Sequence, residues 1–183
     1  MDNPRELQLQ PATSRTRAWL AALTIGLPLI LVGAAVVLGP QIDSPEVLAY
    51  AAPFVVLMFF VIDRALRRHR LTLDAAGGLD LTTTFYRQRL SLGELCIDRA
   101  RVVDLAERTE FTPLLKTNGL SLPGFQSGWF RLRDRSKAFV AIAGGQRVVW
   151  LPTTRGFVLL LQPHQPQALL GRLRELAASS PRG

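Results

Sequence analysis

The chain has 183 residues, which is enough for one medium-sized domain or for a small domain with an additional segment. Apolar residues make up 48% of it, and the mean hydropathy of +0.19 is high for a soluble protein of this size. The single cysteine, Cys96, excludes an internal disulfide and fits a reducing compartment. The net charge of +8 comes mainly from residues 71–183, where fifteen Lys or Arg residues stand against nine acids.

Two long apolar runs dominate the first third of the sequence. Residues 18–38 form a run of 21 residues without a charge, and residues 47–62 form a second run of 16. A helix rises 1.5 Å per residue, so the first run reaches about 30 Å, the thickness of a bilayer core, and the second about 24 Å. Leu66 and a snorkelling Arg64 extend the second run.

These runs predict a transmembrane helical hairpin over residues 18–66, with spans at about 18–38 and 46–66, behind an N-terminal tail of residues 1–17. One alternative is a signal peptide cleaved near residues 49–51, but that position lies inside the second apolar run. Another is a buried helical hairpin, which two consecutive charge-free runs disfavour. Neither run contains an acid or a base, which a transport pathway normally needs, so the hairpin is interpreted as an anchor.

The positive charges around the runs predict their orientation. Arg15 and Arg17 precede the first run, and four arginines follow the second, whereas the connecting turn contains no Lys or Arg. Both ends of the hairpin are therefore predicted to face the cytoplasm. The arginines after the second run are Arg64, Arg67, Arg68 and Arg70.

From residue 71 onward the apolar residues repeat with a period of two. Residues 71–73 and 79–86 alternate apolar and polar side chains around a turn, which predicts a hairpin. Residues 106–127 are interpreted as a long connection, and an amphipathic helix is predicted from Pro166 to residue 178. The further strands are predicted at 89–92, 95–105, 128–132, 138–143, 147–151 and 156–162.

This arrangement of short antiparallel strands followed by one C-terminal helix is the order of a pleckstrin-homology-like domain. The passages that resemble the bacterial pleckstrin-homology-like family are Thr117–Gly119, Leu122–Gly124, Gly128–Leu132, Arg147–Pro152 and Phe157–Leu161. The resemblance implies a mostly β fold with helices, in which residues 71–178 form a pleckstrin-homology-like antiparallel β-barrel capped by an amphipathic helix, with residues 179–183 as a tail. Members of this family often carry one or two transmembrane helices before the domain. The expected location is therefore a bacterial inner membrane, multi-pass, with cytoplasmic N- and C-termini.

The resemblance also implies binding rather than catalysis, but it does not supply a ligand. Lipid-binding eukaryotic relatives hold inositol phosphates with basic residues around the first hairpin turn. Here that turn, Asp74–Asp80, has two acids and no base. A phosphoinositide headgroup is therefore not expected to bind there.

The connection 106–127 is rich in glycine and in large apolar residues. Its order does not match a phosphate-binding loop, because Lys116 comes before the glycines and a strand follows them. The apolar side chains either fold over an open end of the barrel or remain exposed to a membrane surface or a partner. In the second case, the candidate membrane or partner contacts are Lys116, Leu120, Leu122 and Phe125, together with Arg64, Arg67, Arg68 and Arg70. The arginines have an alternative role, since basic residues after a span fix its topology.

The sequence predicts no catalytic, cofactor-binding or metal-ligating residues. His69 and His164 have no Cys, Asp or Glu at metal-ligand spacing, and Cys96 has no companion. We therefore expect a protein that is not an enzyme and holds no cofactor.

The predicted function is a membrane-anchored interaction module that binds another protein or assembles with its own copies. One alternative is a sensor of anionic lipid headgroups, and another is an accessory subunit of a transporter or envelope enzyme. Nucleic acid is not expected as a partner, because only Gly128–Lys137 combines basic residues with aromatic ones.

Overall fold

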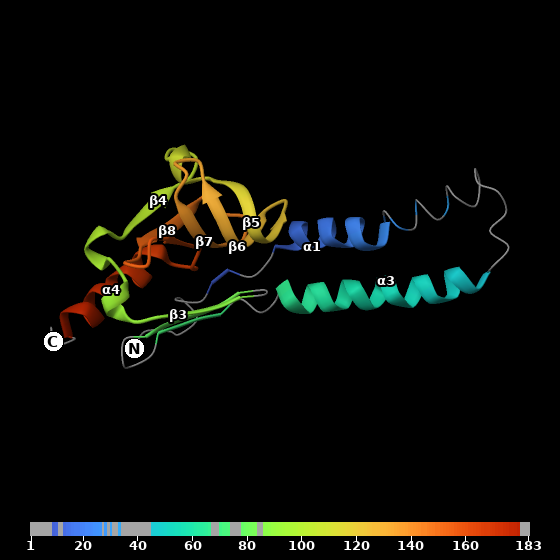
Figure 1. Cartoon of the computed structure of the whole chain (residues 1–183), viewed down its shortest axis with the longest axis horizontal. Coiled ribbons are helices and arrows are strands. Elements are labelled where there is room, and N and C mark those ends of the chain that lie inside the picture. Colours follow the sequence, from blue (N-terminus) through green and yellow to red (C-terminus); the bar gives the residue numbers. More distant parts are fainter. Residues whose placement is uncertain are drawn as a thin grey trace.

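The computed structural model describes most of the chain as a mixed, sheet-rich fold with three α-helices, one sheet of six strands and one of three. The helices α1 and α3 lie side by side and project from one end of the sheets, and α4 lies at the opposite end (Figure 1). The described residues are 9–10, 13–26, 28, 30, 33, 45–66, 70–73, 78–83 and 86–179. The predicted tails therefore lie largely outside the described residues.

The projecting pair consists of α1 (Ser14–Ala21), which a π-helix continues to Gly26, and α3 (Pro45–Leu66). An ion pair ties the two helices together, since Arg17 Nε donates a hydrogen bond of 2.9 Å to Asp63 Oδ1. Asp63 is largely buried, so this contact is better shielded from water than most surface ion pairs.

The predicted membrane spans are not found. Among the described residues, no helix is both long and apolar enough to cross a membrane. The first predicted span does not form one described α-helix, because α1 ends after eight residues. The second coincides with α3, which carries Glu46 near its start and Asp63 and Arg64 near its end. The predicted transmembrane hairpin over 18–66, the integral two-span membrane partner, and the multi-pass inner-membrane localisation are therefore wrong.

The smaller sheet contains β1 (Arg70–Leu73), β2 (Leu79–Thr82) and β3 (Arg87–Leu90), paired antiparallel in that order. The predicted pairing of residues 71–73 with the strand that begins at residue 79 is confirmed. The buried side chains on these strands face the main core, because alternate residues of a strand point to the same side. They are Leu71, Leu79, Leu81 and Leu90.

The larger sheet has the strand order β4-β8-β9-β7-β6-β5. Every neighbouring pair in it is antiparallel except β7 and β9, which are parallel. The predicted antiparallel barrel is therefore corrected to a mixed sheet. The strands are β4 (Arg101–Asp104), β5 (Pro113–Leu122), β6 (Phe125–Leu132), β7 (Lys137–Ile142), β8 (Arg147–Pro152) and β9 (Val158–Leu161).

The parallel pair arises because β9 lies between β7 and β8. The buried side chain of Gln162, directly after β9, organises the turn that follows β7. Its Oε1 accepts hydrogen bonds from the backbone N–H of Ala143 at 2.8 Å and of Gly145 at 3.1 Å. A Cβ at position 145 would lie 2.0 Å from Gln162 Nε2, so a side chain there would displace this amide from its hydrogen bonds. The same amide nitrogen donates to Gln10 Oε1 at 2.7 Å, which adds the N-terminal segment to the sheet.

The predicted connection 106–127 is also corrected, because most of it is strand. β5 and β6 form a hairpin around Pro123–Gly124. Gly119 and Gly128 lie opposite each other in this hairpin, and a Cβ on Gly119 would lie 2.4 Å from the carbonyl oxygen of Ser127. These two glycines therefore allow the strands to approach closely.

Apolar side chains form clusters on both faces of the six-stranded sheet, because successive residues of a strand point to opposite faces. One cluster joins this sheet to the three-stranded sheet and to α4 (Pro166–Ser179) through residues such as Phe139, Leu161 and Leu169. The other cluster includes Phe111, Phe130, Val140, Val148 and Leu160. The central strands β7 and β9 are thus covered on both sides, which gives the edge strands a rigid support.

Candidate interaction surface

Three of the predicted contact residues lie at the junction between the helical pair and the β5–β6 hairpin. Phe125 is 1% exposed and forms a small cluster with Leu20 and Ala143. The apolar residues of 106–127 were expected either to be buried against the fold or to be exposed to a membrane or partner. Leu120, Leu122 and Phe125 are buried or half-buried, because they attach the helices to the sheet. The half-buried residues packed against the cluster are Leu120, Leu122, Phe59 and Ile62.

The predicted basic contacts are scattered rather than gathered. Arg64 is exposed in the last turn of α3, and Arg70 begins β1. Arg67 and Arg68 lie outside the described residues. Lys116 is exposed in the middle of β5.

The part of the chain that the structure describes contains no group of three or more His, Cys, Asp or Glu residues that could hold a metal ion. His164 is exposed and Cys96 is half-buried, whereas His69 lies outside the described residues. The expectation that the chain is not an enzyme stays a prediction.

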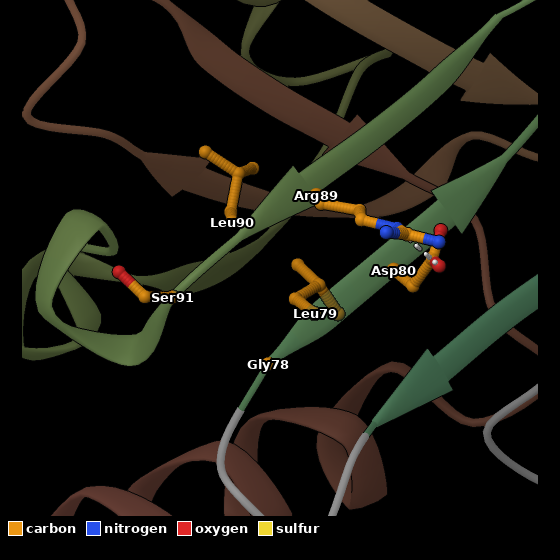
Figure 2. A pocket seen from close by; sticks show the side chains of 6 residues that line it. All are labelled: Gly78, Leu79, Asp80, Arg89, Leu90 and Ser91. Atoms are coloured by element: carbon orange, nitrogen blue, oxygen red, sulfur yellow. Dashed lines mark hydrogen bonds and ion pairs between the residues drawn. The ribbon is translucent and has the colours of Figure 1, made fainter.

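An open cavity of about 460 Å³ lies on the three-stranded sheet, where β2 and β3 come together (Figure 2). Leu79 and Leu90 are almost fully buried beneath it, so its polar character comes from Asp80, Arg89 and Ser91. Gly78 completes the lining.

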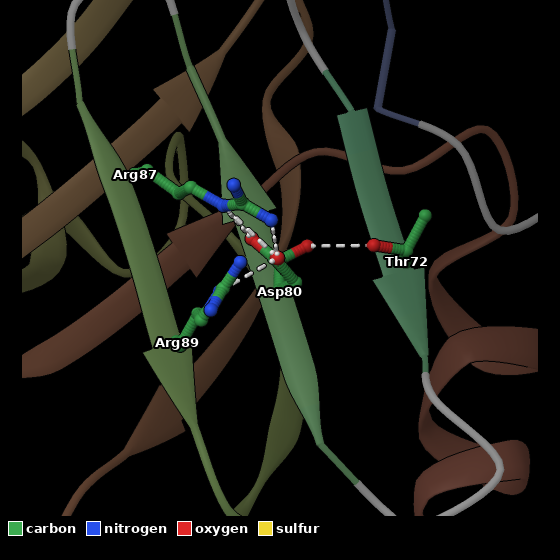
Figure 3. A network of polar contacts seen from close by, with 4 residues as sticks. All are labelled: Thr72, Asp80, Arg87 and Arg89. Carbon is green, nitrogen blue, oxygen red and sulfur yellow. Dashed lines mark hydrogen bonds and ion pairs between the residues drawn. The ribbon is translucent and has the colours of Figure 1, made fainter.

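The charges in this cavity already have partners (Figure 3). The carboxylate of Asp80 accepts hydrogen bonds from Arg87 Nε at 3.0 Å and from Arg89 Nε at 3.2 Å. Hydrogen bonding from the Arg87 guanidinium holds the pKa of the Asp80 carboxyl below its ordinary value of 3.8, against an opposing effect of burial. Thr72 Oγ1 donates to the backbone oxygen of Asp80 at 3.4 Å. This Asp80 cluster therefore stabilises the sheet and leaves no carboxylate free for a ligand.

A second surface lies on β5, an edge strand of the six-stranded sheet. Leu114 is 67% exposed and Leu115 is 59% exposed. The register of β5 shifts between Pro113 and Leu115, so Leu114 is an extra residue at a bulge and the regular alternation between the two faces is interrupted there. Both leucines belong to the apolar side chains of the predicted connection 106–127, but they were not among the predicted contact residues. Their adjacency at a strand position is the signal that could have found them.

A groove of about 360 Å³ lies next to these leucines. The strand register places Leu115, Arg131 and Lys137 in one row across β5, β6 and β7. The next row on the same face contains Asn118 and Trp129. The groove is lined by Thr117, Asn118, Trp129, Arg131 and Lys137.

Trp129 forms the floor of this groove. Its ring makes edge-to-face contacts with Phe139 and Phe157, at centroid distances of 5.2 Å and 5.0 Å. The Lys137 ammonium lies 4.5 Å from the centre of the same ring, which is a cation–π contact. Aromatic packing thus fixes the indole, and the indole in turn positions the ammonium of Lys137.

In the described part of the chain, no ion pair joins either cation of the groove, Arg131 or Lys137, to an acid. Arg131 Nη1 donates instead to the backbone oxygen of Arg135 at 3.1 Å. The nearby Asp134 accepts from the backbone N–H and the hydroxyl of Ser136 at 2.8 Å and 2.6 Å. Its carboxylate is therefore used to shape the turn.

The segment Gly128–Lys137, which combines basic with aromatic residues, was not predicted to be a binding site. The run includes four basic residues and one acid, and the strand register shows that two of the bases meet in the groove. We name this surface, formed by Leu114, Leu115, Thr117, Asn118, Trp129, Arg131 and Lys137, the β5 surface.

The helix α3 has an exposed apolar face of its own. Nothing in the structure shows what covers this face, which ends at the exposed Arg64. Its exposed large side chains are Val56, Leu57, Met58, Phe60 and Val61.

Comparison of the chain with family models, with curated proteins and with solved structures gives no match in any of the three. The resemblance to the bacterial pleckstrin-homology-like family therefore stays a prediction. The candidate site rests on the geometry of this chain alone.

Proposed function

We propose that the chain is a protein-binding module and that the β5 surface is its docking site. The observation that carries this proposal is the pair of exposed leucines, Leu114 and Leu115, beside a groove whose cations lack acidic partners among the residues that the structure describes. Tryptophan and arginine are the residue types that most often dominate binding energy at protein interfaces, and both line this groove.

The leucines supply an apolar anchor for a partner. Complete burial of one leucine side chain contributes roughly 1.5–3 kcal/mol, so two leucines offset part of the cost of association. They lie on an edge strand whose neighbours β6 and β7 are packed into the core, so the anchor is presented by a rigid element.

Binding through side chains fits this surface better than the addition of a strand. Pro113 has no N–H to offer to a new strand, and the register of β5 shifts between Pro113 and Leu115 and again between Lys116 and Asn118. Proline, bulges and an edge lysine are devices that protect a sheet edge from indiscriminate pairing. The partner is therefore expected to contact the exposed side chains rather than to extend the sheet.

The charge of the surface favours a different protein over a second copy of this chain. In a symmetric dimer through this face, Arg131 and Lys137 of each copy would approach the same residues of the other. Like charges that meet at an interface cost several kcal/mol. Self-assembly through the β5 surface is therefore disfavoured.

The proposal is tested by site-specific photo-crosslinking in cells. Leu115 is replaced by p-benzoylphenylalanine in the full chain, and the matched control carries the same replacement at Ser91, an exposed residue of the Asp80 cavity. We expect a defined adduct with another protein from position 115 and none from position 91. The crosslinked protein is then purified, and its affinity for the unmodified chain is measured by calorimetry.

The affinity between the purified partner protein and variants of the chain decides the outcome. Leu114→Ser and Leu115→Ser are each expected to weaken binding by about tenfold, because each removes one exposed apolar anchor. Unchanged affinity of the double variant, or equal adducts at positions 115 and 91, would show that this surface is not the docking site. Adducts with phospholipid in place of protein would also overturn the proposal.

A further inference from the structure

The groove of the β5 surface contains a like-charge pair that no acid relieves. Arg131 and Lys137 are direct cross-strand partners in the register of β6 and β7. Side chains in such positions have Cβ atoms about 4.5–5.5 Å apart, and like charges there destabilise a sheet. On the three-stranded sheet, by contrast, Asp80 lies between two arginines. The groove therefore has the arrangement of an ion-pair cluster whose acid is missing.

The hydrogen-bonding groups around this position define what can fill it. A lysine ammonium and an arginine guanidinium are donors only. The Thr117 hydroxyl already donates to the backbone oxygen of Trp129 at 3.0 Å, so it adds no further donor. The site therefore offers two positive donors above an aromatic floor, and it is complementary to an oxygen anion.

We propose that the groove binds the carboxylate side chains of an acidic segment of the partner protein. This inference rests on the proposed function, which supplies the partner, and it adds the chemistry of the segment that docks. A carboxylate between Arg131 and Lys137 takes the place that Asp80 has in the other cluster. The neighbouring leucines then contact apolar side chains of the same segment.

Nucleic acid fits the groove less well than an acidic peptide. Proteins that bind single strands stack bases on the faces of aromatic side chains. Here the Lys137 ammonium already lies over the ring of Trp129, and two phenylalanines contact the same indole. A base would have to displace the lysine, whereas a carboxylate binds to it where it lies.

The test uses the full chain and a capped hexaglutamate peptide, with hexaglutamine as the uncharged control. Affinity is measured by calorimetry at low and at raised salt. The binding position is read from the indole N–H resonances of the three tryptophans, and Trp129→Phe identifies the resonance of that residue. We expect hexaglutamate to bind and to shift the Trp129 resonance, and hexaglutamine to do neither. Salt should weaken the binding, because it screens exposed charges.

Two double variants with equal loss of charge locate the site. R131Q/K137Q removes both groove cations, whereas R133Q/R135Q removes two arginines from the same hairpin that do not line the groove. All four positions are exposed, so the folds should be retained. We expect R131Q/K137Q to weaken hexaglutamate binding by about tenfold and R133Q/R135Q by less than about twofold, since only the first pair contacts the carboxylates.

The outcomes separate this inference from the proposed function. Equal losses in the two double variants, or no shift of the Trp129 resonance, would overturn the acidic-segment inference. The same holds if an oligothymidine binds at the groove and hexaglutamate does not. If R131Q/K137Q leaves the affinity for the crosslinked protein unchanged while L114S/L115S lowers it, the docking function stands and this inference fails.

Discussion

The Asp80 cluster and the Arg131–Lys137 pair both consist of charged side chains on paired antiparallel strands, but an acid is present in the first and absent from the second. On β2 and β3, Asp80 accepts hydrogen bonds from Arg87 and Arg89 and balances one of the two positive charges. On β6 and β7, Arg131 and Lys137 lie opposite each other without an acid. The first arrangement stabilises its own sheet, and the second leaves positive charge for a ligand.

An acid that is close in sequence is therefore not necessarily an ion-pair partner. Asp134 lies only three residues from both Arg131 and Lys137, but its carboxylate accepts hydrogen bonds within the turn at Ser136. Asp80 lies seven residues from Arg87, and strand pairing brings the two side chains together. Cross-strand register, rather than sequence distance, decides which charges are satisfied.

The largest effect is expected from a substitution that distorts the backbone of the β5–β6 hairpin and with it the β5 surface. In Gly128→Ala the new Cβ would lie 2.6 Å from the carbonyl oxygen of Asn118, at a residue with a positive φ of 116°. We expect the free energy of unfolding in urea to fall by about 2 kcal/mol or more, with loss of hexaglutamate binding. Gly93→Ala, beside the Asp80 cavity, is the control, because nothing lies within 4 Å of its added Cβ. Equal destabilisation by the two variants would contradict this account of the hairpin.

A smaller effect is expected when the Asp80 cluster loses its acid and so resembles the Arg131–Lys137 pair. Asp80→Asn removes the carboxylate and leaves Arg87 and Arg89 without a counter-charge. Exposed ion pairs contribute at most about 1 kcal/mol, so the stability loss in urea should not exceed that value. The variant should also gain weak, salt-sensitive binding of hexaglutamate in calorimetry. A variant that is destabilised but binds no acidic peptide would show that unpaired arginines alone do not make a binding site.

Lowering the pH removes the charge of the Asp80 carboxylate without a substitution. The pKa of Asp80 is lower in the folded chain than its ordinary value of 3.8, so the unfolded chain binds more protons between the two pKa values. The stabilisation by Asp80 is therefore fully present above that ordinary value and is lost as the pH falls through the folded pKa. Urea unfolding from about pH 5 to about pH 2 should show the wild-type advantage over Asp80→Asn disappearing in acid. An advantage that persists at the lowest pH would contradict the assigned role of the carboxylate.

The smallest effect is expected when an acid is placed opposite Arg131, so that this pair resembles the Asp80 cluster. Lys137→Glu and Lys137→Gln both remove the cation–π contact with Trp129, so their difference reports only the charge opposite Arg131. We expect Lys137→Glu to be the more stable by about 0.5 kcal/mol in urea unfolding, since an opposite-charge pair forms across the strands. Both should lose hexaglutamate binding, with Lys137→Glu the weaker binder. If the two are equally stable at low salt, the side chains do not face each other.

Much of the secondary structure could be predicted because its patterns are local. The alternation after residue 71 indicates the first hairpin, and the period near 3.6 after Pro166 indicates α4. β5 was missed because its two adjacent leucines and its bulges interrupt the alternation that marks a strand. The membrane spans were predicted from apolar runs, whereas α1 passes into a π-helix and α3 carries charges near both ends.

The local features of this protein follow from its sequence alone: the turn residues, the alternating strands, the amphipathic helix and the basic run at Gly128–Lys137. The position of β9 between β7 and β8 depends on tertiary contacts, in which a buried Gln162 holds backbone groups distant in sequence. Tertiary contacts also determine which cations have an acid beside them and which leucines are exposed. These properties depend on contacts across strands, and a strand's own sequence does not record which residues lie beside it.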